Sequence, residues 1–170
     1  EISRLAATRY RGENPEVRRG FIFCLYTGLR WCDVRRLTYD NVDFSNRLLR
    51  FEQAKTQSRS SSSAVVIPLS PIGKPQPRDR LIFLLPSRRS CQTALKRWTE
   101  AAGIDKHITW HCARHSFALR ILNKGANIKT VAALLGHSSI RHTEKYTRAV
   151  DTLKLQAIMS LPPLHPEINP

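Results

Sequence analysis

The 170-residue sequence contains no hydrophobic run long enough to cross a membrane. A membrane-spanning helix needs roughly 18 or more consecutive apolar residues, and no signal peptide is present either. The four cysteines form no C-x-x-C pair and no framework of the kind seen in secreted proteins. We therefore expect a soluble, cytoplasmic protein without membrane contact, in which the thiols are reduced and mostly buried.

Acidic residues are scarce relative to basic ones. The chain has 13 Asp and Glu residues against 28 Lys and Arg residues, which gives a formal net charge of +15. The basic residues are spread through segments that look ordered, whereas a basic tail would cluster at one end. Such a charge favours a polyanionic partner, of which nucleic acid is the commonest, although a merely soluble basic protein would also show it.

The length corresponds to one ordinary domain that can bury a real core. Because the sequence opens at Glu1 without a methionine, we expect an excised domain whose N-terminal partner is missing. No internal repeat occurs, and the four consecutive serines at 60–63 are the only low-complexity patch.

The hydrophobic periodicity predicts a mainly α-helical fold with a small antiparallel β-sheet, which is an α+β class. Asn14 and Pro15 mark the start of one helix and Gly28 its end; its apolar run, residues 21–26, should lie deep in the core. Residues 47–55 and 64–70 predict a hairpin with a polar tip, and residues 42–44 a possible third strand. Further helices are expected near residues 2–12, 31–37, 90–103, 110–124, 128–135, 139–146 and 152–161.

The helix that begins near Trp110 carries three residues able to do chemistry. His111 and Arg114 are three residues apart and share one face, and His115 is four residues from His111. Two histidines at this spacing can bind zinc, but a third ligand is missing and no H-E-x-x-H pattern exists. We therefore expect no metal, and a structural role for His115.

Two arginines stand in apolar surroundings. Arg114 lies on the apolar side of its helix, and Arg30 directly follows a very apolar segment. An arginine is rarely buried there without an anion or a partner. Two rigidly held guanidinium groups could cradle phosphate oxygens, with Asp33 orienting one of them. Pairing of each arginine with a structural carboxylate would explain the same pattern.

Lys55, His137 and Tyr146 are less distinctive by themselves. Lys55 ends the first hairpin strand, where an exposed lysine is the simpler interpretation. His137 follows the helix-ending Gly136. Tyr146 could be a core aromatic of an amphipathic helix, but its polar neighbours favour a position at the surface or in a cleft.

Taken together, three segments of the chain resemble the catalytic domain of the tyrosine recombinases, or phage-type integrases. "TGLRWCDVRRLTYDNVDF" resembles the first arginine box of that family, and "HCARHSF" resembles its His-x-x-Arg box. "LLGHSSIRHTEKYTR" resembles the closing box, in which a histidine precedes the tyrosine by nine residues. The sequence departs from the family pattern at Asp33, Tyr39 and Ala113, none of which bears directly on the chemistry. The resemblance implies six catalytic residues: Arg30, Lys55, His111, Arg114, His137 and Tyr146.

The resemblance also implies a mechanism that uses neither a cofactor nor a metal. Tyr146 would attack the scissile phosphate to give a 3′-phosphotyrosyl link and a free 5′-hydroxyl. The two arginines and His137 would hold the non-bridging oxygens. Lys55 would protonate the leaving oxygen, and His111 would assist proton movement or accept the tyrosine proton.

The partners implied by the resemblance are double-stranded DNA and further copies of the protein in a tetrameric synaptic complex. Accessory DNA-bending proteins are possible partners as well, and the enzyme would act at the bacterial nucleoid. The resemblance assigns residues 1–150 to the catalytic domain and leaves residues 151–170 as a C-terminal helix and tail. The missing N-terminal partner would be the core-binding domain, and the hairpin tip at 56–63 should be mobile without DNA.

Two other functions are consistent with part of the sequence. The segment "NIKTVAALLGHSSIRHTEKYTRA" has the pattern of a non-catalytic helix-turn-helix DNA-binding module, but this leaves Arg30 and Arg114 unexplained. A type IB topoisomerase has similar catalytic residues, although the closing box favours the recombinase. A strand-exchange assay separates the two enzymes, since a topoisomerase reseals only the strand that it cut.

Overall fold

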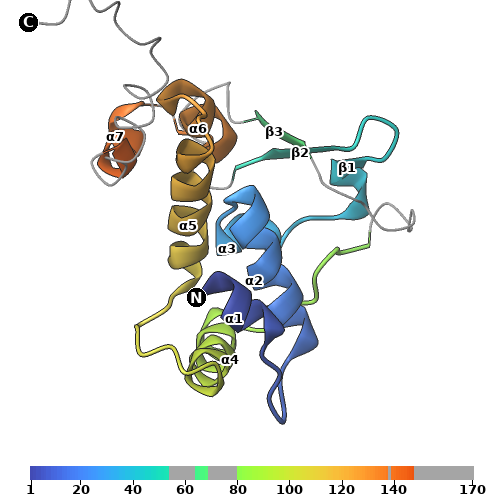
Figure 1. Ribbon diagram of the computed structural model, residues 1–170. Helices are drawn as coiled ribbons and strands as arrows, with labels where there is room; N and C mark the ends of the chain where they lie inside the picture. Colours follow the sequence, from blue (N-terminus) through green and yellow to red (C-terminus); the bar gives the residue numbers. More distant parts are fainter. Residues whose placement is uncertain (54–63, 69–79, 138, 148–170) are drawn as a thin grey trace, which may run out of the picture.

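The computed structural model describes residues 1–53, 64–68, 80–137 and 139–147, which form a helical body with a small sheet at one side (Figure 1). This arrangement confirms the predicted mainly α-helical fold with a small antiparallel sheet. The elements are α1 (Ile2–Ala7), α2 (Pro15–Thr27), α3 (Trp31–Val34), the 3-10 helix η1 (Tyr39–Asn41), β1 (Val42–Asp43), β2 (Leu48–Glu52), β3 (Ala64–Pro68), α4 (Arg88–Ala101), α5 (Trp110–Asn123), α6 (Ile128–Leu135) and α7 (Arg141–Thr147).

Capping residues set two helix ends that matter for the site. The Asn14 side chain accepts hydrogen bonds from the backbone N–H groups of Glu16 and Val17 at the start of α2. This helix ends at Gly28, whose φ of 69° lies in the left-handed region. Gly136 ends α6 in the same conformation, with φ of 60°. These ends agree with the sequence-based predictions and fix where the chain turns towards Arg30 and His137.

Two predicted helix boundaries were wrong. Helix α1 ends at Ala7 and not near Gly12, because the backbone at Thr8 is already extended. Helix α4 begins at Arg88, and its cap is Ser87 and not Ser90. The hydroxyl of Ser87 accepts a hydrogen bond from the backbone N–H of Ser90 at 3.1 Å, which satisfies a donor of the first turn.

The core lies between α2, α4 and α5 (Figure 1). Phe21 is 1% exposed, and its ring meets the rings of Trp98 and Trp110 edge-on. The prediction that the apolar run of α2 is buried throughout was wrong at Tyr26, which is 60% exposed. The Tyr26 ring still has a partner, since the Arg120 guanidinium of α5 lies 4.9 Å from its centroid.

The sheet is antiparallel with the order β1-β2-β3, and β1 is the third strand that the sequence indicated. Leu49 of β2 pairs with Ile67 of β3, and both side chains are buried. Figure 1 shows the sheet reaching from η1 to the end of α6. The predicted hairpin tip, Lys55 and the C-terminal helix and tail all lie outside the described residues.

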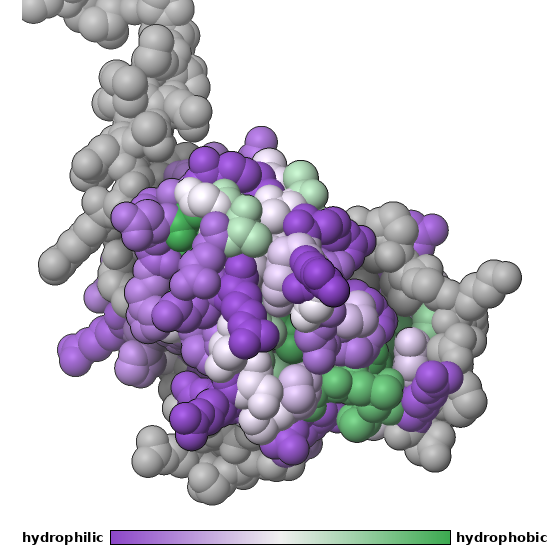
Figure 2. Space-filling model, turned by 90° about the horizontal axis from the view of Figure 1, so that it is seen from below, coloured by the Kyte–Doolittle hydropathy of each residue, from purple (hydrophilic) through white to green (hydrophobic). Residues whose placement is uncertain are grey.

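The surface of the described part is mainly polar. Figure 2 shows the end of the molecule that carries α4, where hydrophilic residues cover most of the face and hydrophobic residues gather at one side. None of the helices in the described ranges is long and apolar enough to cross a membrane. All four cysteines are free thiols, and Cys24 and Cys91 are the two buried ones, so the expectation of mostly buried thiols is confirmed for half of them.

Candidate active site

Arg114 is a deeply buried cation of the candidate site, with 2% of its surface exposed. Its guanidinium donates to the backbone oxygen of Gly28 at 2.8 Å and to that of Leu135 at 2.7 Å. It therefore joins α5, on which it stands, to the ends of α2 and α6. Burial, followed by the nearby charge of Arg30, lowers the pKa of Arg114 to about 10, so the group is still protonated at neutral pH.

Arg30 supplies a second cation beside Arg114. It is the N-cap residue of α3, two residues after Gly28, and its side chain is 21% exposed. Its Nη1 donates to Oε1 of Gln53 and lies 3.9 Å from a carboxylate oxygen of the buried Asp33. This agrees with the predicted orienting role of Asp33. The two arginines thus bring two positive charges to one place on rigid elements, as phosphate binding requires.

Tyr146 lies against a row of two histidines on α5. Its ring centroid is 5.2 Å from that of His115, which in turn is 4.4 Å from that of His111. His111 is exposed, His115 is half-buried, and Tyr146 is only 4% exposed. The ring of Tyr146 therefore contacts His115, and His115 in turn contacts His111.

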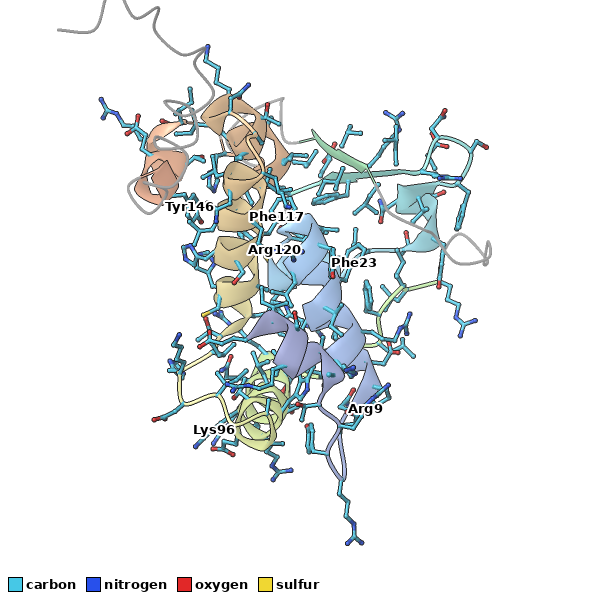
Figure 3. All side chains as sticks on the ribbon, in the orientation of Figure 1. Arg9, Phe23, Lys96, Phe117, Arg120 and Tyr146 are labelled. Atoms are coloured by element: carbon cyan, nitrogen blue, oxygen red, sulfur yellow. The ribbon has the colours of Figure 1, made fainter. Side chains whose placement is uncertain are left out.

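The predicted surface or cleft position of Tyr146 was wrong in this structure. Figure 3 shows its side chain pointing from α7 towards α5, and it belongs to a buried cluster with Phe117 and Leu135. Of its polar neighbours, Glu144 is exposed on the same helix, so the polar character of this stretch did not indicate that Tyr146 itself is buried. Burial raises the pKa of Tyr146, and the charge of Arg114 opposes this increase.

His137 is held at the entrance to α7. It follows Gly136, and its Nδ1 is 2.8 Å from the hydroxyl of Thr143, which is fully buried. The His137 backbone N–H also donates to the oxygen of Ala132 at 2.9 Å. The first bond holds the ring of His137 to α7, and the second holds its backbone to α6.

Gln53 is a part of the site that the sequence interpretation missed. It is 1% exposed and bonds to both Arg30 and the backbone oxygen of Leu135. A signal was present: Leu49 and Phe51 are buried on alternate positions of β2, and Gln53 continues that alternation just after the strand. A polar amide on the buried face of a strand needs hydrogen-bond partners.

The described site contains two guanidinium cations, those of Arg30 and Arg114, and the phenol of Tyr146. Within the ranges that the structure describes, no three His, Cys, Asp or Glu side chains are grouped closely enough to hold a metal ion. The sixth predicted catalytic residue, Lys55, falls outside those ranges. Within the described part of the site, Arg30 lies close enough to Arg114 for the two positive charges to interact, and the charge of Arg114 also acts on the phenol of Tyr146.

Comparisons with known proteins give a consistent result. The model of the phage integrase family matches residues 1–152. The tyrosine recombinase XerD of Corynebacterium glutamicum is 31% identical over 157 residues, which cover 80% of this chain and 50% of that protein. The tyrosine recombinase XerC of Syntrophus aciditrophicus is 33% identical over 114 residues, covering 67% of this chain and 35% of that protein. The chain thus spans about half, or less, of the length of these relatives.

Solved structures resemble the fold over almost the whole chain. The catalytic domain of bacteriophage HP1 integrase has a TM-score of 0.66 and 27% identity, and covers 95% of this chain and 91% of its own. The Tn1549 transposon integrase in complex with transposon right end DNA has a TM-score of 0.66 at 20% identity, covering 93% of this chain and 62% of its own. At 20% identity, the likeness to the Tn1549 transposon integrase concerns the fold alone.

Proposed function

Because the chain belongs to the phage integrase family, we propose that it cuts and rejoins double-stranded DNA as a site-specific tyrosine recombinase. The observation that carries this proposal is the position of Tyr146 beside a buried cation. Arg114 is 2% exposed and Tyr146 is 4% exposed, and the charge of Arg114 acts on the phenol. A buried arginine held by backbone oxygens is suited to an anion that must be desolvated on binding.

In the proposed reaction, Oη of Tyr146 attacks the scissile phosphorus and the bond from phosphorus to the 5′-oxygen breaks. The products are a 3′-phosphotyrosyl ester and a 5′-hydroxyl, which forms when the leaving 5′-oxygen takes up a proton. Attack by the 5′-hydroxyl of a partner strand reverses these steps, so the bond energy is conserved. Arg30 and Arg114 hold the non-bridging oxygens, and His137 donates to one of them. Lys55 remains the proposed acid that protonates the leaving oxygen.

The proton of Tyr146 needs an acceptor. Burial raises the pKa of this phenol, so it is neutral near pH 7 and must lose its proton as it attacks. The His115 ring contacts the Tyr146 ring, whereas His111 contacts His115 and is exposed. We therefore assign the acceptor role to His115 and place His111 one step further along the path to solvent. This replaces the structural role that the sequence favoured for His115.

The proposed partner is double-stranded DNA, which the net charge of +15 supports. The fold is shared with an integrase bound to transposon DNA. We further propose that four copies assemble on DNA, with help from DNA-bending proteins, and that the protein acts at the nucleoid. We also propose that the catalytic domain ends near residue 150 and is accompanied by an N-terminal core-binding domain.

A cleavage assay with the full chain tests the proposed function. The substrate is a plasmid carrying the DNA that flanks the coding sequence, and the control plasmid lacks that DNA. We expect a protein–DNA adduct that survives denaturation, forms in the presence of EDTA, and leads to strand exchange with a second substrate. Cleavage that requires a divalent metal would contradict the proposed chemistry. Resealing without strand exchange would identify a topoisomerase, and binding without an adduct would identify a DNA-binding module.

A further inference from the structure

Gln53 stands at the junction between the sheet and the two arginines. It follows β2 directly and is 1% exposed. Its Oε1 accepts a hydrogen bond from Arg30, and its Nε2 donates to the backbone oxygen of Leu135 at 2.9 Å. Both ends of the amide are therefore used, one by a side chain proposed to bind the phosphate and the other by the last residue of α6.

The oxygen of Leu135 is shared. It accepts from Gln53 and also from Arg114, at 2.7 Å. Arg114 bonds in turn to the oxygen of Gly28, two residues before Arg30. The hydrogen bonds thus form a closed path from Arg30 through Gln53, Leu135 and Arg114 back to the segment that carries Arg30. A closed path of this kind fixes the separation of the two guanidinium groups.

The backbone beside this path leaves room only for glycine. A Cβ on Gly136 would lie 2.6 Å from Cδ of Gln53 and 2.7 Å from Cγ2 of Val65, and φ of Gly136 is 60°. Gln53 therefore packs directly under the turn that positions His137. The position of Gln53 therefore affects both Arg30 and the backbone that carries His137.

An amide suits this position because it accepts and donates at once. A glutamate would still accept from Arg30 but could not donate to Leu135, and its charge would face a carbonyl oxygen. A leucine would provide neither bond and would leave Arg30 without this acceptor. Each substitution removes a different part of the path, so the two can be told apart.

We propose that Gln53 is a positioning residue for DNA cleavage, which holds Arg30, Arg114 and the turn before His137 in the arrangement that the phosphate requires. This inference rests on the proposed function. In this proposal Gln53 acts through Arg30 and Arg114, which are the residues proposed to hold the phosphate. Its loss should therefore slow the chemical step more than it weakens DNA binding.

The test compares Gln53→Leu and Gln53→Glu with Gln92→Leu in the full chain. Gln92 is a matched control, because its Nε2 also donates to a backbone oxygen, that of Ile108 at 2.8 Å, but from α4. Single-turnover cleavage and DNA affinity are measured on nicked duplexes that carry the flanking DNA. We expect both Gln53 variants to cleave at least about tenfold more slowly, as a displaced group would, with affinity changed by less than about threefold. Gln92→Leu should match the wild type in both measurements.

A second readout does not depend on activity. Because Nη1 of Arg30 donates to Gln53, the Nη–Hη signals of Arg30 in ¹⁵N NMR spectra should exchange faster with water in Gln53→Leu than in the wild type, and Gln92→Leu should leave them unchanged. If the wild-type protein forms no adduct with DNA, the proposed function is refuted. The NMR comparison would still decide whether Gln53 holds Arg30. The inference would be overturned if Gln53→Leu cleaved DNA as fast as the wild type and left the Arg30 signals unchanged. Loss of folding in both Gln53 variants would also overturn it, since Gln53 would then act on stability alone.

Discussion

The rings of His115 and Tyr146 contact each other, with 5.2 Å between their centroids and 63° between their planes. The sequence pattern favoured His111 as the histidine that serves the tyrosine, because His111 belongs to the His-x-x-Arg box. In the folded chain, the ring centroids of His111 and His115 are 4.4 Å apart, and His115 is the histidine that contacts Tyr146, the proposed nucleophile. The two histidines therefore have different expected roles that mutation can separate.

Replacing His115 with phenylalanine should slow cleavage more than the same change at His111. Phenylalanine preserves a ring against Tyr146 and removes only the proton-accepting nitrogens. Loss of a general base typically costs roughly 10²–10⁴-fold in rate, and we expect His115→Phe to fall in that range. Single-turnover cleavage rates of the two variants and of the wild type provide the measurement. A larger defect in His111→Phe would contradict the assignment.

The turn at Gly136 should tolerate alanine less well than an open turn does. Gly136 and Gly125 both have positive φ, of 60° and 89°, but a Cβ on Gly125 would meet nothing within 4 Å. Positive φ alone costs a non-glycine residue about 1–2 kcal/mol, so Gly125→Ala should lower the free energy of unfolding by about that amount. Gly136→Ala adds the clash with Gln53 and should cost at least about 1 kcal/mol more. Equal melting temperatures for the two variants would show that Gln53 does not occupy the space under the turn.

Much of the fold could be predicted because short-range signals determine it. Asn14 and Gly28 begin and end α2 through their own backbone and side-chain chemistry, and the alternation in β2 is visible in the sequence. Arg114 could be singled out because an arginine on the apolar side of a helix is rare.

Other features depend on contacts between distant segments and could not be read locally. The polar residues around Tyr146 in the sequence favoured an exposed position, whereas its burial depends on packing against Phe117 of α5. Gln53 carries no charge, and its partners Arg30 and Leu135 are 23 and 82 residues away in the sequence. Tyr26 was expected in the core because residues 21–26 form an apolar run, yet it is 60% exposed and contacts Arg120 of α5.

DNA binding should depend steeply on salt. The chain has a net charge of +15, and each phosphate contact releases counterions, so the slope of log K against log salt should be about −0.9 per contact. Arg141 is exposed at the start of α7, next to the site. Lys96 lies at the opposite end of the molecule from Tyr146 (Figure 3). We expect Arg141→Gln to reduce the slope by about one and Lys96→Gln to leave it unchanged. Titrations at several salt concentrations that gave a flat response would contradict this electrostatic binding.

The most direct measurement is the identity of the residue that becomes linked to DNA. After incubation with the flanking DNA, the full chain is denatured and digested with nuclease and protease, and the modified peptide is sequenced by mass spectrometry. We expect the nucleotide on Tyr146. Tyr146→Phe should lose the adduct, while its folding and DNA affinity persist because only the phenolic oxygen is removed. Tyr26→Phe, which alters a tyrosine that is 60% exposed, should form the adduct normally. A nucleotide on Tyr10, Tyr26 or Tyr39, or an adduct that persists in Tyr146→Phe, would show that the nucleophile lies elsewhere.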